Sequence, residues 1–233
     1  MKYLIVNADD FGAGRGVNRG ILEAHRRGIV TSTSLMVTTR WSEEATALAR
    51  AAPELDVGLH VDCGNGGRAP ESGIELTDAE SWKTELHSQL RRFEELVGRL
   101  PTHLDSHHNG HRDARLLPFF LDVARRYRLP LREHSPARYL SNFYGQWGGE
   151  THLEQISVDS LLHMLETEIG EAVTELGCHP GYVDADLCSG YASEREAELQ
   201  TLCDPAIPAA LAERRIQLIS FRDLSALRQN APD

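Results

Sequence analysis

The sequence predicts an α/β protein built around a parallel β-sheet. Short apolar runs alternate with longer amphipathic stretches along the chain, the pattern expected when parallel strands are joined by crossover helices. The composition is that of a globular protein, with 41% hydrophobic and 25% charged residues over 233 positions. Since no internal repeat and no Ser- or Pro-rich linker divides the chain, we expect residues 1–233 to fold as a single domain.

The alternation predicts about seven strands and seven helices. The strand candidates are residues 2–8, 33–38, 56–61, 102–106, 130–133, 173–178 and 216–221. The helix candidates are residues 17–27, 43–52, 79–97, 116–128, 158–169, 194–202 and 207–214. Residues 62–73, with four glycines, and residues 135–151, with the aromatic Tyr139, Phe143, Tyr144 and Trp147, are predicted to be long loops. Loops of this length usually carry function.

Charge and cysteine content exclude several classes of protein. Twenty-four Lys and Arg against 35 Asp and Glu give a formal net charge of −11, which would repel a phosphate backbone, so we expect no nucleic-acid partner. The first apolar run is too short for a signal peptide, and no stretch approaches the roughly 20 apolar residues of a membrane span. We therefore expect a cytoplasmic protein with no membrane partner. Cys63, Cys178, Cys188 and Cys203 lack a CxxC spacing and are interpreted as reduced thiols.

Two adjacent acids, Asp9 and Asp10, directly follow the apolar run of residues 3–6. The carboxyl end of a strand is where α/β barrels place catalytic groups, whereas a plain solvated turn would more usually carry Asn-Gly or Asp-Gly. The plain turn stays open as the alternative. If both acids are buried, they cannot both ionise at low cost, so we expect a metal to neutralise one while the other serves as a base.

Histidines gather at two further strand ends. Four fall within the nine residues 103–111, and such a density of imidazole and carboxylate is typical of a metal site. Strand alternation puts His103, Asp105 and His107 on one face, so not all of the cluster can bind a metal, and His107, at the end of the strand, is our choice. His60 ends another candidate strand; taken alone, it is better interpreted as a core histidine.

The sequence Cys178-His179-Pro180-Gly181 follows the strand candidate of residues 173–178. Pro180 restricts His179 to extended conformations, and Gly181 permits a sharp turn, so His179 is expected to be held rigidly at a strand end. A histidine fixed there can protonate a leaving amine, although an incidental turn histidine explains the motif equally well.

Together these residues predict an open metal site. Asp10, His60 and His107 offer three ligands from three strand ends, which leaves positions for water and substrate, as in catalytic rather than structural sites. Asp9 is then the candidate base for the water proton and His179 the candidate acid for the leaving nitrogen.

Five motifs make the chain resemble the YdjC-like carbohydrate deacetylases. They are NADDFG (7–12), GIVTSTSLM (28–36), GLHVD (58–62), PTHLDSHHNGH (101–111) and CHPG (178–181). They occur in order and span most of the chain. The resemblance implies a distorted TIM-like (β/α) barrel, related in chemistry to the NodB-type polysaccharide deacetylases, which use an Asp-His-His metal triad.

By position, the resemblance implies that Asp10, His60 and His107 bind one divalent metal ion, that Asp9 is the base and that His179 is the acid. It further implies hydrolysis of the acetamide of a small N-acetylated amino sugar, and a homodimer. Imidazole ligands favour zinc or a neighbouring ion, whereas the family is associated with magnesium, so the metal is left open. The exact sugar is also left open.

Other interpretations remain beside this one. Asp and His around an open ion also suit phosphoester hydrolysis, and a non-catalytic sugar- or metal-binding barrel is a further alternative. Arg132 is expected to orient Asp9, to bind substrate, or to form a surface salt bridge with Glu133 or another acid. The aromatic side chains Phe143, Tyr144 and Trp147 are expected either to stack on a sugar face or to form dimer contacts.

Overall fold

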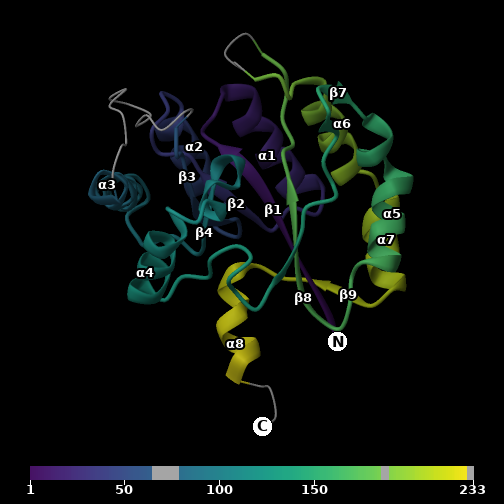
Figure 1. Cartoon of the computed structure of the whole chain (residues 1–233). Helices are drawn as coiled ribbons and strands as arrows, with labels where there is room; N and C mark the ends of the chain where they lie inside the picture. Colours follow the sequence, from purple (N-terminus) through teal and green to yellow (C-terminus); the bar gives the residue numbers. More distant parts are fainter. Residues whose placement is uncertain (65–78, 185–188, 230–233) are drawn as a thin grey trace.

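A seven-stranded, all-parallel sheet forms the centre of the computed structural model, which describes residues 1–64, 79–184 and 189–229 (Figure 1). The strand order is β4-β3-β2-β1-β8-β5, and β9 pairs with the start of β1. The strands are β1 (Lys2–Phe11), β2 (Ser32–Leu35), β3 (Asp56–Val61), β4 (Leu104–Ser106), β5 (Arg138–Leu140), β8 (Ala172–Cys178) and β9 (Ile216–Leu218). The sheet curls into a half-barrel, so the predicted α/β barrel class with about seven parallel strands is confirmed.

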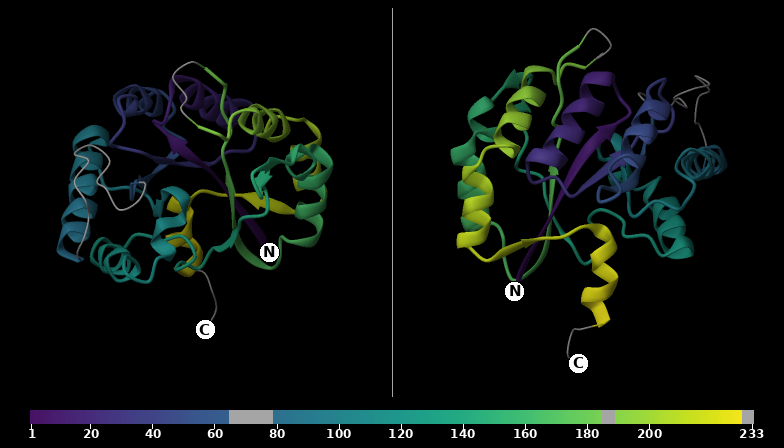
Figure 2. Two further views of the ribbon diagram at one scale, coloured as in Figure 1. Left: turned by 45° about the horizontal axis from the view of Figure 1, so that its top comes forward. Right: turned by 180° about the vertical axis from the view of Figure 1, so that it is seen from behind.

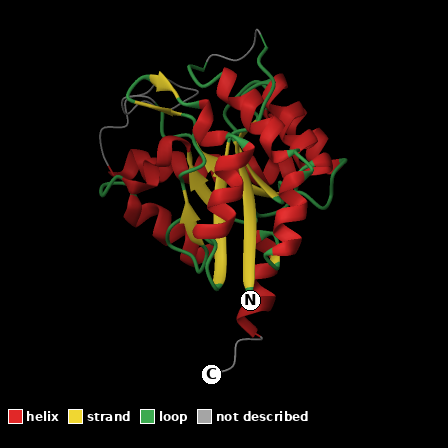
Figure 3. Ribbon diagram, turned by 90° about the vertical axis from the view of Figure 1, so that its right-hand side faces the viewer, coloured by secondary structure: helices red, strands yellow, loops and turns green. Residues whose placement is uncertain are grey.

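Helices surround the curled sheet (Figures 2 and 3). Those on the flank of β1 to β4 are α1 (Arg15–Arg27), α2 (Ser42–Arg50), α3 (Ala79–Val97) and α4 (Leu117–Tyr127). Those that follow are α5 (Val158–Thr167), α6 (Ser193–Leu202), α7 (Ala206–Glu213) and α8 (Leu224–Gln229), with 3-10 turns η1 (His107–Arg112), η2 (Leu153–Ile156) and η3 (Phe221–Asp223). Because helices cover it, β1 is buried from Leu4 to Phe11, as is usual in parallel sheets.

The prediction of a strand at residues 130–133 is wrong. Leu131 makes a single parallel bridge to Leu104, and the chain turns at Glu133, whose φ is 63°. A single bridge is too short to form a strand, and the left-handed backbone of Glu133 redirects the chain two residues later.

The prediction of a long loop at residues 135–151 is also wrong, because this segment contains β5 and the antiparallel hairpin of β6 (Gln146–Trp147) and β7 (Glu150–Thr151). The predicted loop at residues 62–73 lies outside the described residues from position 65 onward.

The structure bears on the predictions about the cysteines and about membrane-spanning helices. Cys63, Cys178 and Cys203 are free thiols, whereas Cys188 lies outside the described residues. Among helices in the described ranges, none has the length and apolar character needed to cross a membrane.

Helix α1 packs directly on the segment that follows β8. A Cβ added at Gly20 would lie 2.5 Å from the Cα of Gly181, and one added at Gly16 would lie 2.1 Å from the carbonyl oxygen of Tyr182. Backbone therefore meets backbone at this contact. Any side chain larger than hydrogen at these positions would push away the segment that carries His179.

We expect Gly20→Ala to destabilise the protein by about 1–3 kcal/mol, because the added methyl group overpacks a contact between two backbones. Urea unfolding followed by circular dichroism measures the change. Gly170→Ala is the matched control, since a Cβ there meets nothing within 4 Å. Equal unfolding midpoints for Gly20→Ala and the wild type would contradict the close packing.

Candidate active site

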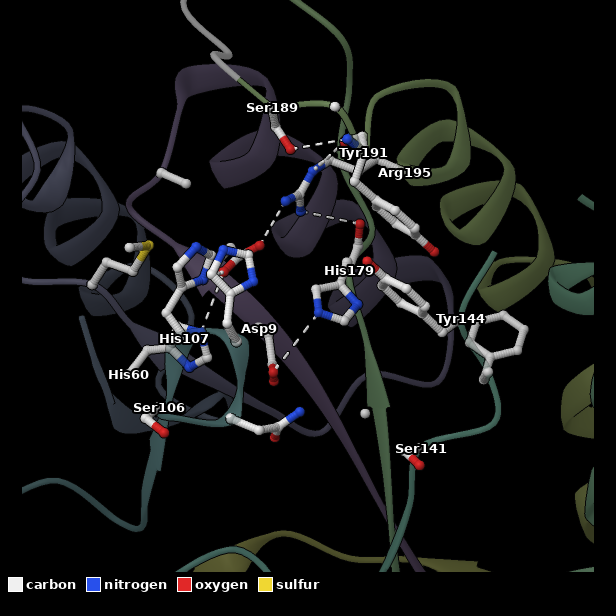
Figure 4. A pocket seen from close by; sticks show the side chains of 18 of the residues that line it. Asp9, His60, Ser106, His107, Ser141, Tyr144, His179, Ser189, Tyr191 and Arg195 are labelled. Atoms are coloured by element: carbon white, nitrogen blue, oxygen red, sulfur yellow. Dashed lines mark hydrogen bonds and ion pairs between the residues drawn. The ribbon is translucent and has the colours of Figure 1, made fainter. Parts of the chain in front are cut away.

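The five residues selected from the sequence line one pocket of about 700 Å³ at the carboxyl ends of the strands (Figure 4). Asp9 and Asp10 come from β1, His60 from β3, His107 from the start of η1 just after β4, and His179 from the residue after β8. The volume lies within the range typical of small-molecule sites. Because the strands are parallel, their carboxyl ends meet at one edge, which brings these side chains together.

A bulge turns both adjacent acids into the pocket. Successive residues of a regular strand point to opposite faces, so Asp9 and Asp10 could not both line one cavity without a distortion. The register between β1 and β2 shifts between Ala8 and Phe11, and Asp10 has a φ of 68°. This left-handed residue at the end of β1 lets both carboxylates face the same space.

Asp10, His60 and His107 form a group that could hold a metal ion. The Oδ1 atom of Asp10 lies 3.0 Å from Nδ1 of His107 and 3.3 Å from Nε2 of His60. Bonds of roughly 2.0–2.2 Å around a tetrahedral or octahedral ion place neighbouring ligand atoms about 3.0–3.5 Å apart, so the donor set fits a divalent transition ion. Burial alone would lower the pKa of His60, but Asp105 and Asp10 raise it to about 10, so this corner of the pocket favours positive charge.

Asp105 fixes the orientation of His60. The Nδ1 atom of His60 lies 2.7 Å from Oδ1 of the fully buried Asp105, which turns Nε2 toward Asp10. A carboxylate behind a ligating imidazole is a recurrent feature of metal sites. Asp105 was not predicted from the sequence to support the site. Its position two residues before His107, on the same face of the predicted strand, could have indicated it.

Of the four clustered histidines, His107 is the one that contacts Asp10. His103 is buried and stacks on Phe221 with ring centroids 3.8 Å apart, and His111 is hydrogen-bonded to Ser106. The ring of His108 lies over that of His107. The cluster is therefore divided: His107 and His108 line the pocket, whereas His103 and His111 make structural contacts.

Arg132 is buried and holds Asp9 with two hydrogen bonds, of 2.7 Å from Nη1 to Oδ2 and 2.8 Å from Nη2 to Oδ1. The expectation of a surface salt bridge with Glu133 is wrong, because Glu133 accepts from Arg112 instead. Burial raises the pKa of Asp9, but the Arg132 guanidinium outweighs this effect and leaves the pKa below its usual value. Asp9 is therefore ionised at neutral pH.

His179 lies between two acids. Its Nε2 is 3.9 Å from Oδ2 of Asp9, and its Nδ1 is 3.9 Å from Oε1 of Glu198 on α6. Its backbone N–H donates to Oε2 of Glu198. Burial lowers the pKa of His179 to about 4 and raises that of Glu198 to about 8, so at neutral pH the ring is uncharged and the Glu198 carboxyl is protonated.

Besides His60 and His107, Asp10 has a buried partner on α6, Arg195. The Nη2 atom of Arg195 donates to Oδ2 of Asp10 at 2.6 Å. Burial would raise the pKa of Asp10, but Arg195 and the hydrogen bonds from His107 and His60 hold it well below its usual value. Arg195 and Glu198 were not predicted. Their charge was the only sign of a role that the sequence offered. Helix α6 has no distinct apolar face from which its inward-facing residues could be predicted.

The aromatic residues of the 135–151 segment have three different environments. Phe143 is buried in the core. Tyr144, 37% exposed, lines the pocket and stacks on Tyr191 with centroids 4.6 Å apart. Trp147 stacks on His152 in the hairpin and is not among the pocket-lining residues. Tyr139 and Phe143 also line the pocket, but Tyr144 is the most exposed of the three and is therefore the best placed to meet a bound ligand.

The fold and pocket define a class of protein, a curled α/β half-barrel with a polar site at the carboxyl ends of its strands. The family 4 carbohydrate esterase of Streptomyces lividans, solved in complex with acetate, shares this fold, with a TM-score of 0.58 and 15% identity over 95% of this chain and 94% of that one. The chain itself belongs to the YdjC-like protein family, whose profile matches residues 3–213. This confirms the resemblance found in its motifs.

Curated relatives cover nearly the full length. A carbohydrate deacetylase from Geobacillus stearothermophilus is 38% identical, over 97% of this chain and 99% of the relative. A chitooligosaccharide deacetylase from Serratia marcescens is 36% identical, over 96% of this chain and 99% of the relative. A solved structure from Enterococcus faecalis, provisionally named a cellobiose-phosphate cleavage protein, has a TM-score of 0.81 and 32% identity over 96% of this chain and 98% of that one.

We expect Glu198→Gln to weaken the pH dependence of stability. A Glu with its pKa raised to about 8 keeps its proton in the folded state but loses it above about 4.5 when unfolded, so stability falls as pH rises from about 4.5 to 8, by up to about 1.4 kcal/mol per pH unit. Glutamine mimics the protonated form and removes this contribution. Urea unfolding at pH 5.5, 6.5 and 7.5 measures it, with the exposed Glu213→Gln as control. If the free energy of unfolding fell as steeply between pH 5.5 and 7.5 in Glu198→Gln as in the wild type, Glu198 would not be protonated in the folded protein.

Proposed function

We propose that the protein is a carbohydrate deacetylase that hydrolyses the acetamide of an N-acetylated amino sugar to acetate and a free amine, using a divalent metal ion held by Asp10, His60 and His107. One observation carries the proposal. A single oxygen of Asp10 contacts both imidazoles, while Asp9 and His179 face each other across the same pocket. The names of the curated relatives support the same class of reaction.

The residues around Asp9 suit it to the role of base. When bound, a divalent ion supplies a Lewis acid that polarises the acetyl carbonyl and lowers the pKa of water. Asp9 is ionised because Arg132 lowers its pKa, so its Oδ2 can accept the proton of the attacking water. Arg132 also fixes the direction of this carboxylate.

His179 supplies the proton that the leaving nitrogen needs. Because burial lowers its pKa to about 4, the ring is neutral before reaction and must first gain a proton. Oδ2 of Asp9, which holds the proton taken from water, lies 3.9 Å from Nε2 of His179, and the substrate between the two groups can relay that proton. The proton taken from water is therefore passed on toward the amine as the carbon–nitrogen bond breaks, and Asp9 returns to its ionised form.

The chemistry of the ligands supports zinc or a neighbouring transition ion. Two imidazoles and one carboxylate suit such ions, whereas magnesium prefers oxygen ligands and keeps several waters. The relatives' names support an oligosaccharide containing N-acetylglucosamine as substrate. The homodimer and the cytoplasmic location remain predictions.

We expect Asp9→Asn to lower acetate release from N-acetylglucosamine oligomers by at least about 100-fold without loss of bound metal, because it removes only the base. His60→Ala should lose both metal and activity. His163→Ala, on the exposed face of α5, is the control. Acetate release and metal content are measured after dialysis against a chelator and return of zinc, with phosphate release measured in parallel. Undiminished acetate release in both variants would refute the mechanism, and phosphate release alone would favour the phosphoester alternative.

We expect Tyr144→Ala to raise KM for these oligomers roughly 3- to 10-fold with little change in kcat, because its ring is placed to stack on a sugar face and such contacts contribute about 0.5–1.5 kcal/mol. Tyr144→Phe should keep most of the binding. Trp147→Ala is the matched control, since this ring stacks on His152. A larger rise in KM for Trp147→Ala than for Tyr144→Ala would show that the wrong aromatic has been chosen.

A further inference from the structure

We propose that Arg195 is a positioning residue that commits Asp10 to offer one oxygen, Oδ1, to the metal ion, and that it ties this carboxylate to the segment carrying His179. The inference rests on the proposed function, in which Asp10 binds the ion.

The two oxygens of Asp10 have different partners. Oδ2 accepts from Nη2 of Arg195 at 2.6 Å, while Oδ1 faces His60 and His107. The side chains of Arg195 and Asp10 are 4% and 3% exposed, so water does not compete for these contacts. A carboxylate without such a partner can rotate and present either or both oxygens. The hydrogen bond from Arg195 therefore selects one orientation.

Arg195 is itself fixed on several sides. Its Nε donates to the carbonyl oxygen of Tyr191 at 3.0 Å, and its Nη1 donates to that of His179 at 3.3 Å. Its own carbonyl oxygen accepts from the N–H of Gly181 at 3.1 Å. Figure 4 shows its guanidinium turned toward the side of the pocket that holds His107 and His60. The residue thus links Asp10 to both backbone positions that flank Pro180.

These contacts argue against a direct role in gripping substrate. Arg195 borders the pocket, but each nitrogen of its guanidinium already donates to a protein oxygen and its side chain is only 4% exposed. Holding Asp10 to one oxygen leaves more coordination positions for water and for the acetyl oxygen than a carboxylate binding through both. Loss of the guanidinium should therefore alter coordination and kcat, rather than the affinity for sugar.

The test uses the full-length protein loaded with Co²⁺, whose visible absorption reports coordination number. We expect Arg195→Gln to weaken and shift the Co²⁺ bands and to lower kcat about 10- to 100-fold, the usual effect of removing a group that orients a ligand, with KM changing less than about 3-fold. Arg195→Lys keeps the charge but cannot reach all three oxygens, so it should shift the bands in the same direction with a smaller loss of kcat. Arg214→Gln is the control, because Arg214 pairs with Glu166 and Glu213 outside the pocket.

The outcomes separate the inference from the proposed function. A wild-type spectrum and wild-type kcat in Arg195→Lys, or in a folded Arg195→Gln, would overturn the inference while leaving the proposed function intact. A raised KM with an unchanged spectrum would show that Arg195 contacts substrate, which also overturns it. Failure of the wild type to bind Co²⁺ and to release acetate would refute the proposed function, and the inference with it.

Discussion

A single buried guanidinium, that of Arg132, holds three strands of the sheet together where the pocket begins. It forms ion pairs of 2.7 Å with Asp9 of β1, 2.9 Å with Asp105 of β4 and 2.6 Å with Glu175 of β8. Arginine suits this position because its planar fork carries five donors, whereas lysine would reach fewer of these acids. Removing one partner of a buried ion pair typically costs about 3–5 kcal/mol, because the remaining charge has no partner. The same guanidinium that links these three strands therefore fixes the direction of the proposed base.

From Arg132 a line of alternating charges crosses the pocket. Asp105 bonds to His60, His60 faces Asp10, and Asp10 bonds to Arg195. This line corrects one expectation drawn from the sequence. Two adjacent buried acids were expected to need a metal to neutralise one of them, but the structure gives each acid an arginine of its own, Arg132 for Asp9 and Arg195 for Asp10. Both carboxylates are therefore ionised before any ion binds, and a metal would meet a charged ligand beside a charged base.

The sequence predicts the residues at the strand ends far better than it predicts the residues that support them. β3 and α3 have the predicted bounds because each is a continuous periodic run, and parallel strands necessarily bring residues such as His60 and His107 to one edge. By contrast, β5 is a three-residue strand with one buried side chain, which gives no detectable alternation. Arg195 lies 185 residues from Asp10, on a helix whose buried residues include charged ones, so only the tertiary structure reveals the pair. The orientation of both Asp9 and Asp10 into the pocket likewise depends on the left-handed φ of Asp10, which no spacing in the sequence indicates.

The gap between Asp9 and His179 leaves room for part of the substrate to lie between the two groups. Oδ2 of Asp9 and Nε2 of His179 are 3.9 Å apart, too far for a direct hydrogen bond. An atom at a hydrogen-bond distance of roughly 2.8 Å from both would see them at about a right angle. In the tetrahedral adduct the attacking oxygen and the leaving nitrogen are bonded to one carbon, so the oxygen can face Asp9 and the nitrogen His179 without any side-chain movement. The contacts of α1 with Gly181 and of α6 with His179 keep this gap at a fixed width, which makes the backbone packing behind His179 part of the chemistry.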